Sequence, residues 1–191
     1  EYINFSGKNK SIGSFPQVAD QTITVNGFSK GFSMTGWRLG YIGAPKEIAA
    51  ACTKIQGQIT SGATSFGQKA AVEALANPNH PDILAMKQAF LDRRDLVITL
   101  LSAIPGIKVN KPEGAFYIFP EVNSFFGKSY NGQTIHNADD FCIYLLNKAH
   151  VAAVSGEPFG APNCLRISYA ASDDILKEAI HRIAKACHQL S

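Results

Sequence analysis

The segment VNGFSKGFSMTGWRLGYIG, residues 25–43, places a lysine and an arginine eight positions apart among glycines and hydroxyl side chains. It follows QTITV (21–25), whose alternation and β-branched residues predict a strand. Its own end, LGYIGAP (39–45), predicts a second short strand. The two cations therefore lie in a loop between two strands. Because glycine lets the backbone approach a ligand closely, this composition favours a binding site.

The residue types of this loop match one kind of ligand. A lysine amine forms a Schiff base with a carbonyl group, which makes Lys30 a possible covalent anchor. Arg38 offers a planar donor fork that suits a phosphate, and Ser29 offers a hydroxyl close to the lysine. A cofactor that carries both a carbonyl and a phosphate would engage both cations. Pyridoxal 5′-phosphate (PLP) is such a molecule.

The same stretch resembles a known family signature. GFSKGFSMTGWRLG (27–40) resembles the lysine signature of class I aminotransferases, which are fold-type I PLP-dependent enzymes, and MTGWRLGY is closest to their aspartate aminotransferase-like branch. The matching residues are Gly27, Phe28, Ser29, Lys30, Ser33, Met34, Gly36, Arg38, Leu39 and Gly40. The resemblance implies that Lys30 is catalytic and holds PLP as a Schiff base, that Arg38 binds its phosphate, and that Ser29 neighbours the phosphate or the lysine. Gly27 stands where many members have a serine that contacts the phosphate.

A second match lies far downstream. GEPFG (156–160) followed by LRISYA (165–170) resembles the C-terminal segment of the family, whose arginine binds the substrate α-carboxylate. The resemblance assigns that role to Arg166. An alternative is a structural ion pair of Arg166 with Glu157 or Asp173. PEGAFYIFP (112–120) also resembles a strand of the family's small domain, for which we expect a packing role.

Periodicity along the rest of the chain predicts further elements. Helices are expected over 46–58, 69–76, about 83–104, 138–149 and from Ser172 onward, with strands at 107–109, 114–122, 151–154 and 164–170 and a turn-rich loop at 123–134. The third helix has an apolar stripe that indicates core packing. The stripe consists of Ile83, Met86, Phe90, Val97, Leu101 and Ile104.

Helices that alternate with short apolar strands predict a layered α/β fold. The resemblance implies the C-terminal part of a fold-type I PLP-dependent transferase, namely the end of the large-domain sheet and the small α/β C-terminal domain. The prolines and asparagines of NPNHPD (77–82) predict the boundary. We therefore expect residues 1–80 to belong to the large PLP-binding domain and residues 81–191 to form the small domain.

Composition excludes several classes of protein. Charged residues make up 17% of the 191 residues and the net charge is +3, without a basic stripe, so we expect no nucleic-acid partner. No apolar run is long enough to span a bilayer, and the start has no signal-peptide core, so we expect no membrane partner. The dispersed cysteines (Cys52, Cys142, Cys164 and Cys187) indicate reduced thiols in the cytoplasm, and the scattered histidines support no metal site.

One apparent phosphate-binding loop motif is incomplete. The triplet GKS at residues 127–129 would need a glycine five positions before Gly127, and that position is Val122. A solvated loop is therefore the preferred interpretation of this triplet.

The resemblance implies an aminotransferase that moves an amino group between an amino acid, aspartate or a related one, and a 2-oxo acid. It implies a homodimer as well, in which TSGATSF (60–66) either reaches the partner's site or is an ordinary interhelical loop. Two alternatives stay open: a PLP-dependent lyase or synthase of the same fold, and a non-catalytic fragment or regulator module. The family's phosphate loop, ring-stacking aromatic residue, asparagine and aspartate-x-x-tyrosine pair are not found among the 191 residues. We therefore expect this chain alone to be incomplete and inactive.

Overall fold

The computed structural model describes residues 3–7 and 9–191, and the chain divides into two compact units. The N-terminal unit comprises Glu1–Lys87 and the C-terminal unit comprises Gln88–Ser191. The division falls inside the long helix α3 (Pro81–Ser102), whereas the sequence places the domain boundary between residues 80 and 81. Each unit is described separately below.

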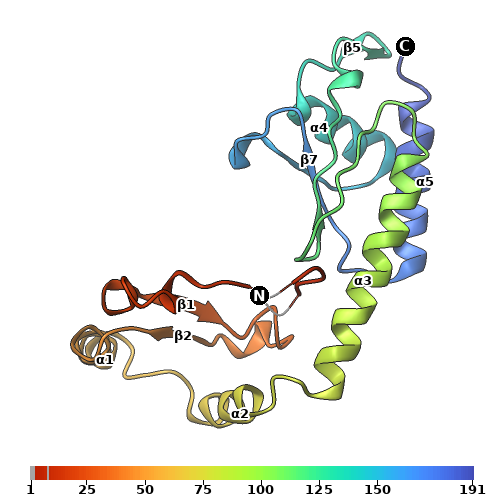
Figure 1. The fold of residues 1–191 in the computed structure, drawn as a ribbon. Helices are drawn as coiled ribbons and strands as arrows, with labels where there is room; N and C mark the ends of the chain where they lie inside the picture. Colours follow the sequence, from red (N-terminus) through yellow and green to blue (C-terminus); the bar gives the residue numbers. More distant parts are fainter. Residues whose placement is uncertain (1–2, 8) are drawn as a thin grey trace. The chain divides into compact units, whose positions relative to one another are not determined.

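The N-terminal unit is built on an antiparallel ribbon of two strands (Figure 1). Val25 pairs with Ile42, and Gly27 pairs with Gly40 at the loop end of the ribbon. In the described residues, two whole helices, the start of α3 and three short 3-10 turns complete the unit. The elements are η1 (Ile12–Ser14), η2 (Ala19–Gln21), β1 (Thr24–Gly27), η3 (Thr35–Trp37), β2 (Gly40–Gly43), α1 (Lys46–Ile59) and α2 (Ser65–Ala76).

The core of this unit is small and lies on one face of the ribbon. Its buried members are Phe28, Met34 and Leu39, which pack with Tyr41 and with the alanines of α2. Tyr41 follows the alternation of strand side chains, so its neighbour Ile42 and the paired Val25 point to the opposite face. On that face Val25 remains 75% exposed.

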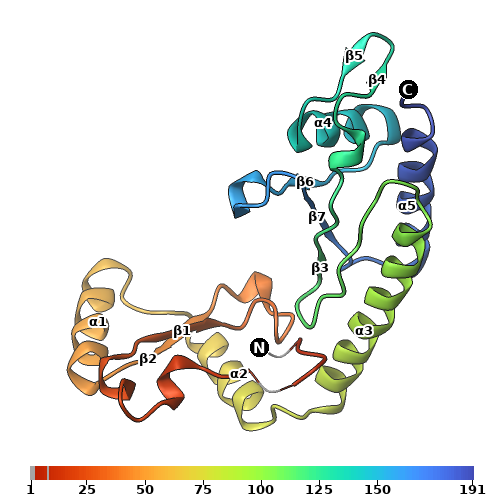
Figure 2. The same ribbon diagram turned by 45° about the horizontal axis from the view of Figure 1, so that its top comes forward.

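The C-terminal unit packs helices against an antiparallel sheet whose order is β3–β7–β6. Its part of α3 runs beside α5 in both views (Figure 1 and Figure 2), and an Arg93–Asp173 ion pair of 3.1 Å joins the two helices. The further elements are β3 (Tyr117–Ile118), η4 (Asn123–Phe125), β4 (Ser129–Tyr130), β5 (Gln133–Thr134), α4 (Ala138–Ala149), β6 (Val154–Ser155), η5 (Glu157–Phe159), β7 (Leu165–Ser168) and α5 (Asp173–Cys187).

A continuous apolar core holds this unit together. It draws fully buried side chains from α3, the sheet, α4 and α5, including Leu101, Ile118, Phe141, Leu165 and Ile183. Burial of this kind stabilises a fold by about 1.5–3 kcal/mol for each large side chain. The C-terminal unit therefore has a complete core of its own.

Most predicted elements are confirmed, and the strands differ most. The strand expected at 107–109 is reduced to one bridge between Lys108 and Glu121, and the strand expected at 114–122 is regular only at Tyr117–Ile118. The expected turn-rich loop contains the hairpin β4–β5, which turns through Asn131 and Gly132, both with positive φ. That asparagine–glycine pair is the usual residue choice for a two-residue hairpin turn.

The apolar stripe of α3 is buried only in its second half. Val97, Leu101 and Ile104 are buried, whereas the earlier members are half-buried. The helix also buries Arg94, which the sequence did not predict; its guanidinium contacts Asp95 and donates to the Pro112 carbonyl at 3.2 Å. Although α3 has 22 residues, neither it nor another helix in the described residues is apolar enough to cross a bilayer.

All four cysteines are free thiols. Burial raises the pKa of Cys187 to about 12, and burial together with the Asp139 carboxylate raises the pKa of Cys142 to about 11. Burial also raises the pKa of Cys164. Because the thiolate is the reactive form, these three thiols are poor nucleophiles at neutral pH. Cys52, on α1, is exposed.

Candidate active site

Residues 28–39 form a hairpin loop that the Gly27–Gly40 pair closes. Both ends of the segment that carries the lysine are anchored in the core, because Phe28 is 3% exposed and Met34 is 9% exposed. The Phe28 amide donates to the Leu39 carbonyl, and the Met34 amide donates to the Phe28 carbonyl, each at 3.2 Å. The intervening residues 29–33 are thereby held as a tight turn on a packed base.

Lys30 lies on this turn. Its carbonyl accepts a hydrogen bond of 3.2 Å from the amide of Ser33, which adopts a left-handed conformation with φ of 54°. Ser29 is half-buried and Lys30 is exposed, while Gly31 is buried. The backbone of the lysine is therefore fixed, and its side chain is accessible to a ligand.

Arg38 occupies a strained backbone position. It follows η3 in the left-handed region, with φ of 54° and ψ of 49°. Its guanidinium Nη1 donates to the Thr35 carbonyl at 2.9 Å. A left-handed conformation costs a non-glycine residue about 1–2 kcal/mol, and glycine would avoid that cost. Arg38 shares this conformation with Ser33 of the same loop, whose φ is also 54°.

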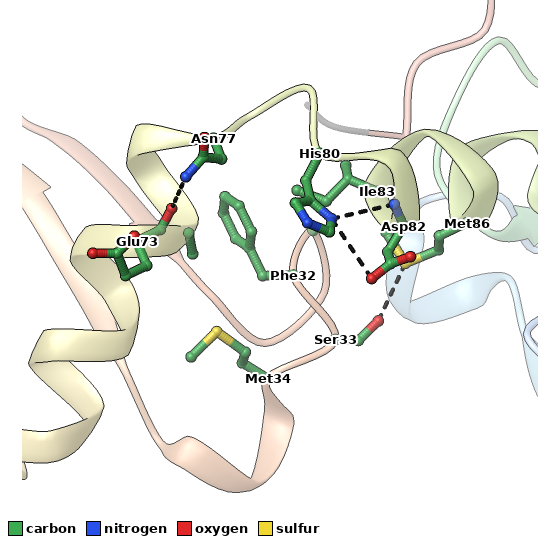
Figure 3. A pocket seen from close by; sticks show the side chains of 11 residues that line it. Phe32, Ser33, Met34, Glu73, Asn77, His80, Asp82, Ile83 and Met86 are labelled. Carbon is green, nitrogen blue, oxygen red and sulfur yellow. Dashed lines mark hydrogen bonds and ion pairs between the residues drawn. The ribbon is translucent and has the colours of Figure 1, made fainter.

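A cavity of about 490 Å³ lies beside the lysine loop within the N-terminal unit (Figure 3). Figure 3 shows Phe32 between Asn77 and His80, with Met34 on the loop side. The His80 imidazole accepts a hydrogen bond of 3.3 Å from the Asp82 amide and lies 3.6 Å from the Asp82 carboxylate. None of the four predicted site residues lines this cavity. It is lined by the part of the loop that follows the lysine, together with residues from α2 to the start of α3.

In the C-terminal unit, two aromatic rings contact Arg166. The central guanidinium carbon lies 4.6 Å from the centre of the Tyr117 ring and 4.5 Å from that of Phe159. Tyr117 pairs with Ser168 across the β3–β7 ladder, so Arg166 is its diagonal neighbour on the same face. Cation–π contacts with two rings restrain the position of the guanidinium.

The ion pairs considered for Arg166 are not formed. Asp173 instead binds Arg93 at 3.1 Å. The Glu157 carboxylate makes no ion pair with Arg166, and within residues 3–7 and 9–191 no carboxylate lies within 4.0 Å of it. The half-buried guanidinium thus contacts two aromatic rings. It has no partner of opposite charge in the described chain.

Gly156 supports this arrangement. It is buried at the base of the GEPFG turn, where its amide donates to the Cys164 carbonyl at 2.8 Å and its carbonyl accepts from Phe159 at 2.9 Å. A Cβ at this position would overlap the carbonyl oxygens of Ala161 and Cys164. The absence of a side chain at Gly156 therefore lets the turn close and place Phe159 against Arg166.

We expect Gly156→Ala to destabilise the protein by about 1–3 kcal/mol, because overpacking forces the backbone to move. Urea unfolding followed by circular dichroism measures the loss. Gly57→Ala is the matched control: Gly57 lies in α1 with open space around its Cα. That change should instead stabilise by about 0.5–1 kcal/mol, as expected for glycine to alanine in a helix. Equal effects of the two changes would contradict the steric argument.

The structure thus brings Ser29, Lys30 and Arg38 onto one loop, while Arg166 belongs to the other compact unit. Sequence reasoning missed the direct role of Tyr117 and Phe159 as neighbours of Arg166. The strand PEGAFYIFP was assigned to packing alone. Its alternation, with Ile118 buried and Tyr117 on the other face, is the signal that would have pointed to Tyr117.

Comparison with known proteins agrees with these features. The family model for aminotransferase class I and II matches residues 2–183. The chain belongs to this family. Its members are PLP-dependent enzymes, and the resemblance of the sequence to the class I aminotransferases is confirmed.

Individual relatives indicate which branch of the family the chain resembles. A bifunctional aspartate aminotransferase and glutamate/aspartate-prephenate aminotransferase from Petunia hybrida is 49% identical over 179 residues, which cover 92% of this chain and 37% of that protein. An aspartate aminotransferase from Pinus pinaster is 46% identical over 94% of this chain and 37% of its own length.

The crystal structure of the Rhizobium meliloti aspartate aminotransferase has a TM-score of 0.92 and 42% identity over all of this chain and 48% of its own. The predicted fold, part of a fold-type I α/β enzyme, is confirmed. The chain spans less than half the length of these relatives.

Proposed function

We propose that this chain carries the lysine and carboxylate-binding part of an aminotransferase that moves an amino group between aspartate, or a related amino acid, and a 2-oxo acid. One observation carries the proposal: Lys30 and Arg38 lie on a single core-anchored hairpin loop. The names of relatives at 46–49% identity support the aspartate branch.

The residues present fit PLP. Lys30 supplies an exposed side chain on the tight turn, and Arg38 supplies an exposed, planar donor fork on the same loop. The Ser29 hydroxyl lies next to the lysine in the chain. Lys30 would attach the cofactor, Arg38 would bind its phosphate, and Ser29 would contribute a hydrogen bond. When bound, PLP supplies an electron sink for the bonds at the substrate Cα.

The roles of the chain's own residues follow from their chemistry. Arg166 would bind the α-carboxylate through two parallel hydrogen bonds, with Tyr117 and Phe159 keeping its plane in place. With its amine released from the cofactor, Lys30 would take the proton from the substrate Cα and return it during the reaction, as a general base and then a general acid. Arg38 would hold the phosphate end while this proton moves.

We also propose a cytoplasmic homodimer. Four free thiols support a reducing compartment. In the segment 60–66, which the dimer hypothesis concerns, Phe66 is 70% exposed and its ring lies 6.0 Å from Trp37. An exposed aromatic pair near the lysine loop supports a contact with a partner, and sedimentation of the complete enzyme measures its oligomeric state.

Covalent trapping tests the proposal on this chain alone. The protein is incubated with PLP, reduced with borohydride and digested, and the modified peptides are identified by mass spectrometry. We expect the label on Lys30 at concentrations that leave Lys46 and Lys54 of α1 unmodified. Uniform labelling of these exposed lysines would contradict the assignment.

Arg38→Met is expected to raise the PLP concentration needed for half-labelling by about tenfold or more, because a charge-assisted hydrogen bond contributes about 1.5–3 kcal/mol. Arg182→Met is the matched control, since Arg182 lies on α5 and binds Glu178 at 2.7 Å. An Arg38 variant that labels like the parent protein would remove Arg38 from the phosphate site.

A further inference from the structure

Tyr169 holds the segment that leads into β3. It follows β7 directly and is completely buried. Its hydroxyl donates to the Ala115 carbonyl at 3.0 Å, and its amide donates to the Phe116 carbonyl at 2.9 Å. Burial raises the pKa of Tyr169 to about 12, so the hydroxyl keeps its proton and remains a donor at neutral pH. One residue therefore holds two consecutive carbonyls of this segment.

The segment depends on such contacts because its backbone is strained. Ala115 has a left-handed φ of 62°, which is unfavourable for a residue with a Cβ and persists only where surrounding contacts hold it. Upstream in the same segment, the Pro112 carbonyl accepts a hydrogen bond of 3.2 Å from the buried Arg94. Because β3 is only two residues long, its ladder fixes little of the chain before it. The start of β3 therefore depends on the side chains of Arg94 and Tyr169.

The residue that starts β3 is Tyr117, whose ring centre lies 4.6 Å from the central guanidinium carbon of Arg166. Arg166 lies on β7, three residues before Tyr169. Tyr169 thus ties the end of the strand that carries the arginine to the segment that carries the ring. A displacement of the Ala115 carbonyl would move Tyr117, two residues later in the chain, and would loosen its contact with the guanidinium.

We propose that Tyr169 is a positioning residue: its hydroxyl fixes Ala115, and through it Tyr117, so that the guanidinium of Arg166 is held where it meets the substrate α-carboxylate. This inference rests on the proposed function, in which Arg166 binds that carboxylate. The effect of the hydroxyl should therefore appear in the binding of the carboxylate and not in the proton transfer at Lys30.

The test uses a fusion of residues 1–191 with the portion of the Rhizobium meliloti enzyme that this chain does not match. Tyr169→Phe removes the hydroxyl and keeps the ring. It should raise the KM for aspartate about threefold to tenfold, which is the effect expected for the loss of one neutral hydrogen bond. The kcat should change by less than about twofold, because the groups that move the proton are untouched. Amino transfer from a primary amine without a carboxylate should not change.

Tyr144→Phe is the matched control. Tyr144 is also buried, and its hydroxyl donates to the Ala186 carbonyl at 2.8 Å. The two substitutions remove the same kind of hydrogen bond from the same unit, so they should lower the urea midpoint of unfolding to a similar extent. Only Tyr169→Phe should raise the KM for aspartate. A KM that both variants raise equally would make the Tyr169 hydroxyl merely structural and would refute the proposal.

A double-mutant cycle with Arg166→Met shows whether Tyr169 acts through the arginine. Once Arg166 is replaced, Tyr169→Phe should lower kcat/KM for aspartate no further, and an additive loss would contradict the proposal. If Arg166→Met left the KM for aspartate unchanged, the proposed function would fail. If Arg166→Met raised that KM and Tyr169→Phe did not, only the role of Tyr169 would fail.

A measurement on the 191-residue chain needs no enzymatic activity, and the C-terminal unit has a complete core of its own. Aromatic rings shift the NMR signals of nearby groups, so the side-chain Nε–H signal of Arg166 reports its position relative to Tyr117 and Phe159. Tyr169→Phe should shift this signal, whereas Tyr144→Phe should leave it in place. An Arg166 signal that is the same in the parent chain and in Tyr169→Phe would overturn the proposal.

Discussion

Replacing Lys30 by alanine should lower the rate of amino transfer by about 10³-fold or more. The assay uses a fusion that joins residues 1–191 to the portion of the Rhizobium meliloti enzyme that this chain does not match, so that both parts of the fold are present in one polypeptide. A positioned general base contributes about 10²–10⁴-fold to proton transfer, and Lys30→Ala also removes the covalent anchor. Turnover of aspartate with a 2-oxo acid, and the visible absorption of the bound cofactor, measure the two losses.

Two control variants separate these roles from structure. Lys30→Arg keeps the positive charge but supplies a group that does not deprotonate in proteins, so activity should stay lost. Lys46→Ala removes an exposed lysine from the first turn of α1 and should retain full activity. A Lys30→Ala fusion that keeps its absorption band and its rate would overturn the assignment of Lys30.

Local patterns predicted the helices well, because their signals are short-range. The helix expected at 138–149 occurs as Ala138–Ala149, and the Asn137 side chain caps it by accepting the Asp140 amide at 2.9 Å. The helix expected from Ser172 onward occurs as Asp173–Cys187, and Ser172 occupies its N-cap position without a capping side-chain hydrogen bond. The helix start was thus predictable from residue type, whereas the capping bond depends on the side-chain conformation.

Strand limits were less predictable, since they depend on partners far away in the sequence. The first strand was expected at 21–25 and occurs at Thr24–Gly27, where β2 provides hydrogen-bonding partners. Residues 19–21 form a 3-10 turn instead. A strand's apolar alternation can be read locally, but the residues it pairs with are decided by the rest of the sheet.

In the candidate site too, local features were predictable from the sequence, whereas features that depend on distant residues were not. Lys30, Ser29 and Arg38 were assigned from one continuous motif, and the structure places them on one loop. The left-handed backbone of Arg38 was not predictable, because nothing in its residue type favours that conformation. The two aromatic rings that contact Arg166 come from β3 and η5, so their proximity to it depends on the tertiary fold.

Replacing Arg166 by methionine in the same fusion should lower kcat/KM for aspartate by about 10²–10³-fold. Two charge-assisted hydrogen bonds to the α-carboxylate would be lost, each contributing about 1.5–3 kcal/mol with some overlap. Methionine retains much of the apolar stem between Tyr117 and Phe159, so the unfolding midpoint should change little.

A substrate that lacks the carboxylate distinguishes binding from a structural role. Amino transfer from a simple primary amine should be slow in the parent fusion and no slower in Arg166→Met, because no carboxylate contact is at stake. For aspartate, the kcat/KM of the Arg166→Lys fusion should lie between those of the parent and the Arg166→Met fusion. Lysine keeps the positive charge but loses the planar fork that makes two parallel bonds. If Arg166→Met slowed the amine and the amino acid equally, the guanidinium would serve to pack Tyr117 against Phe159, and the carboxylate would have to bind to another residue.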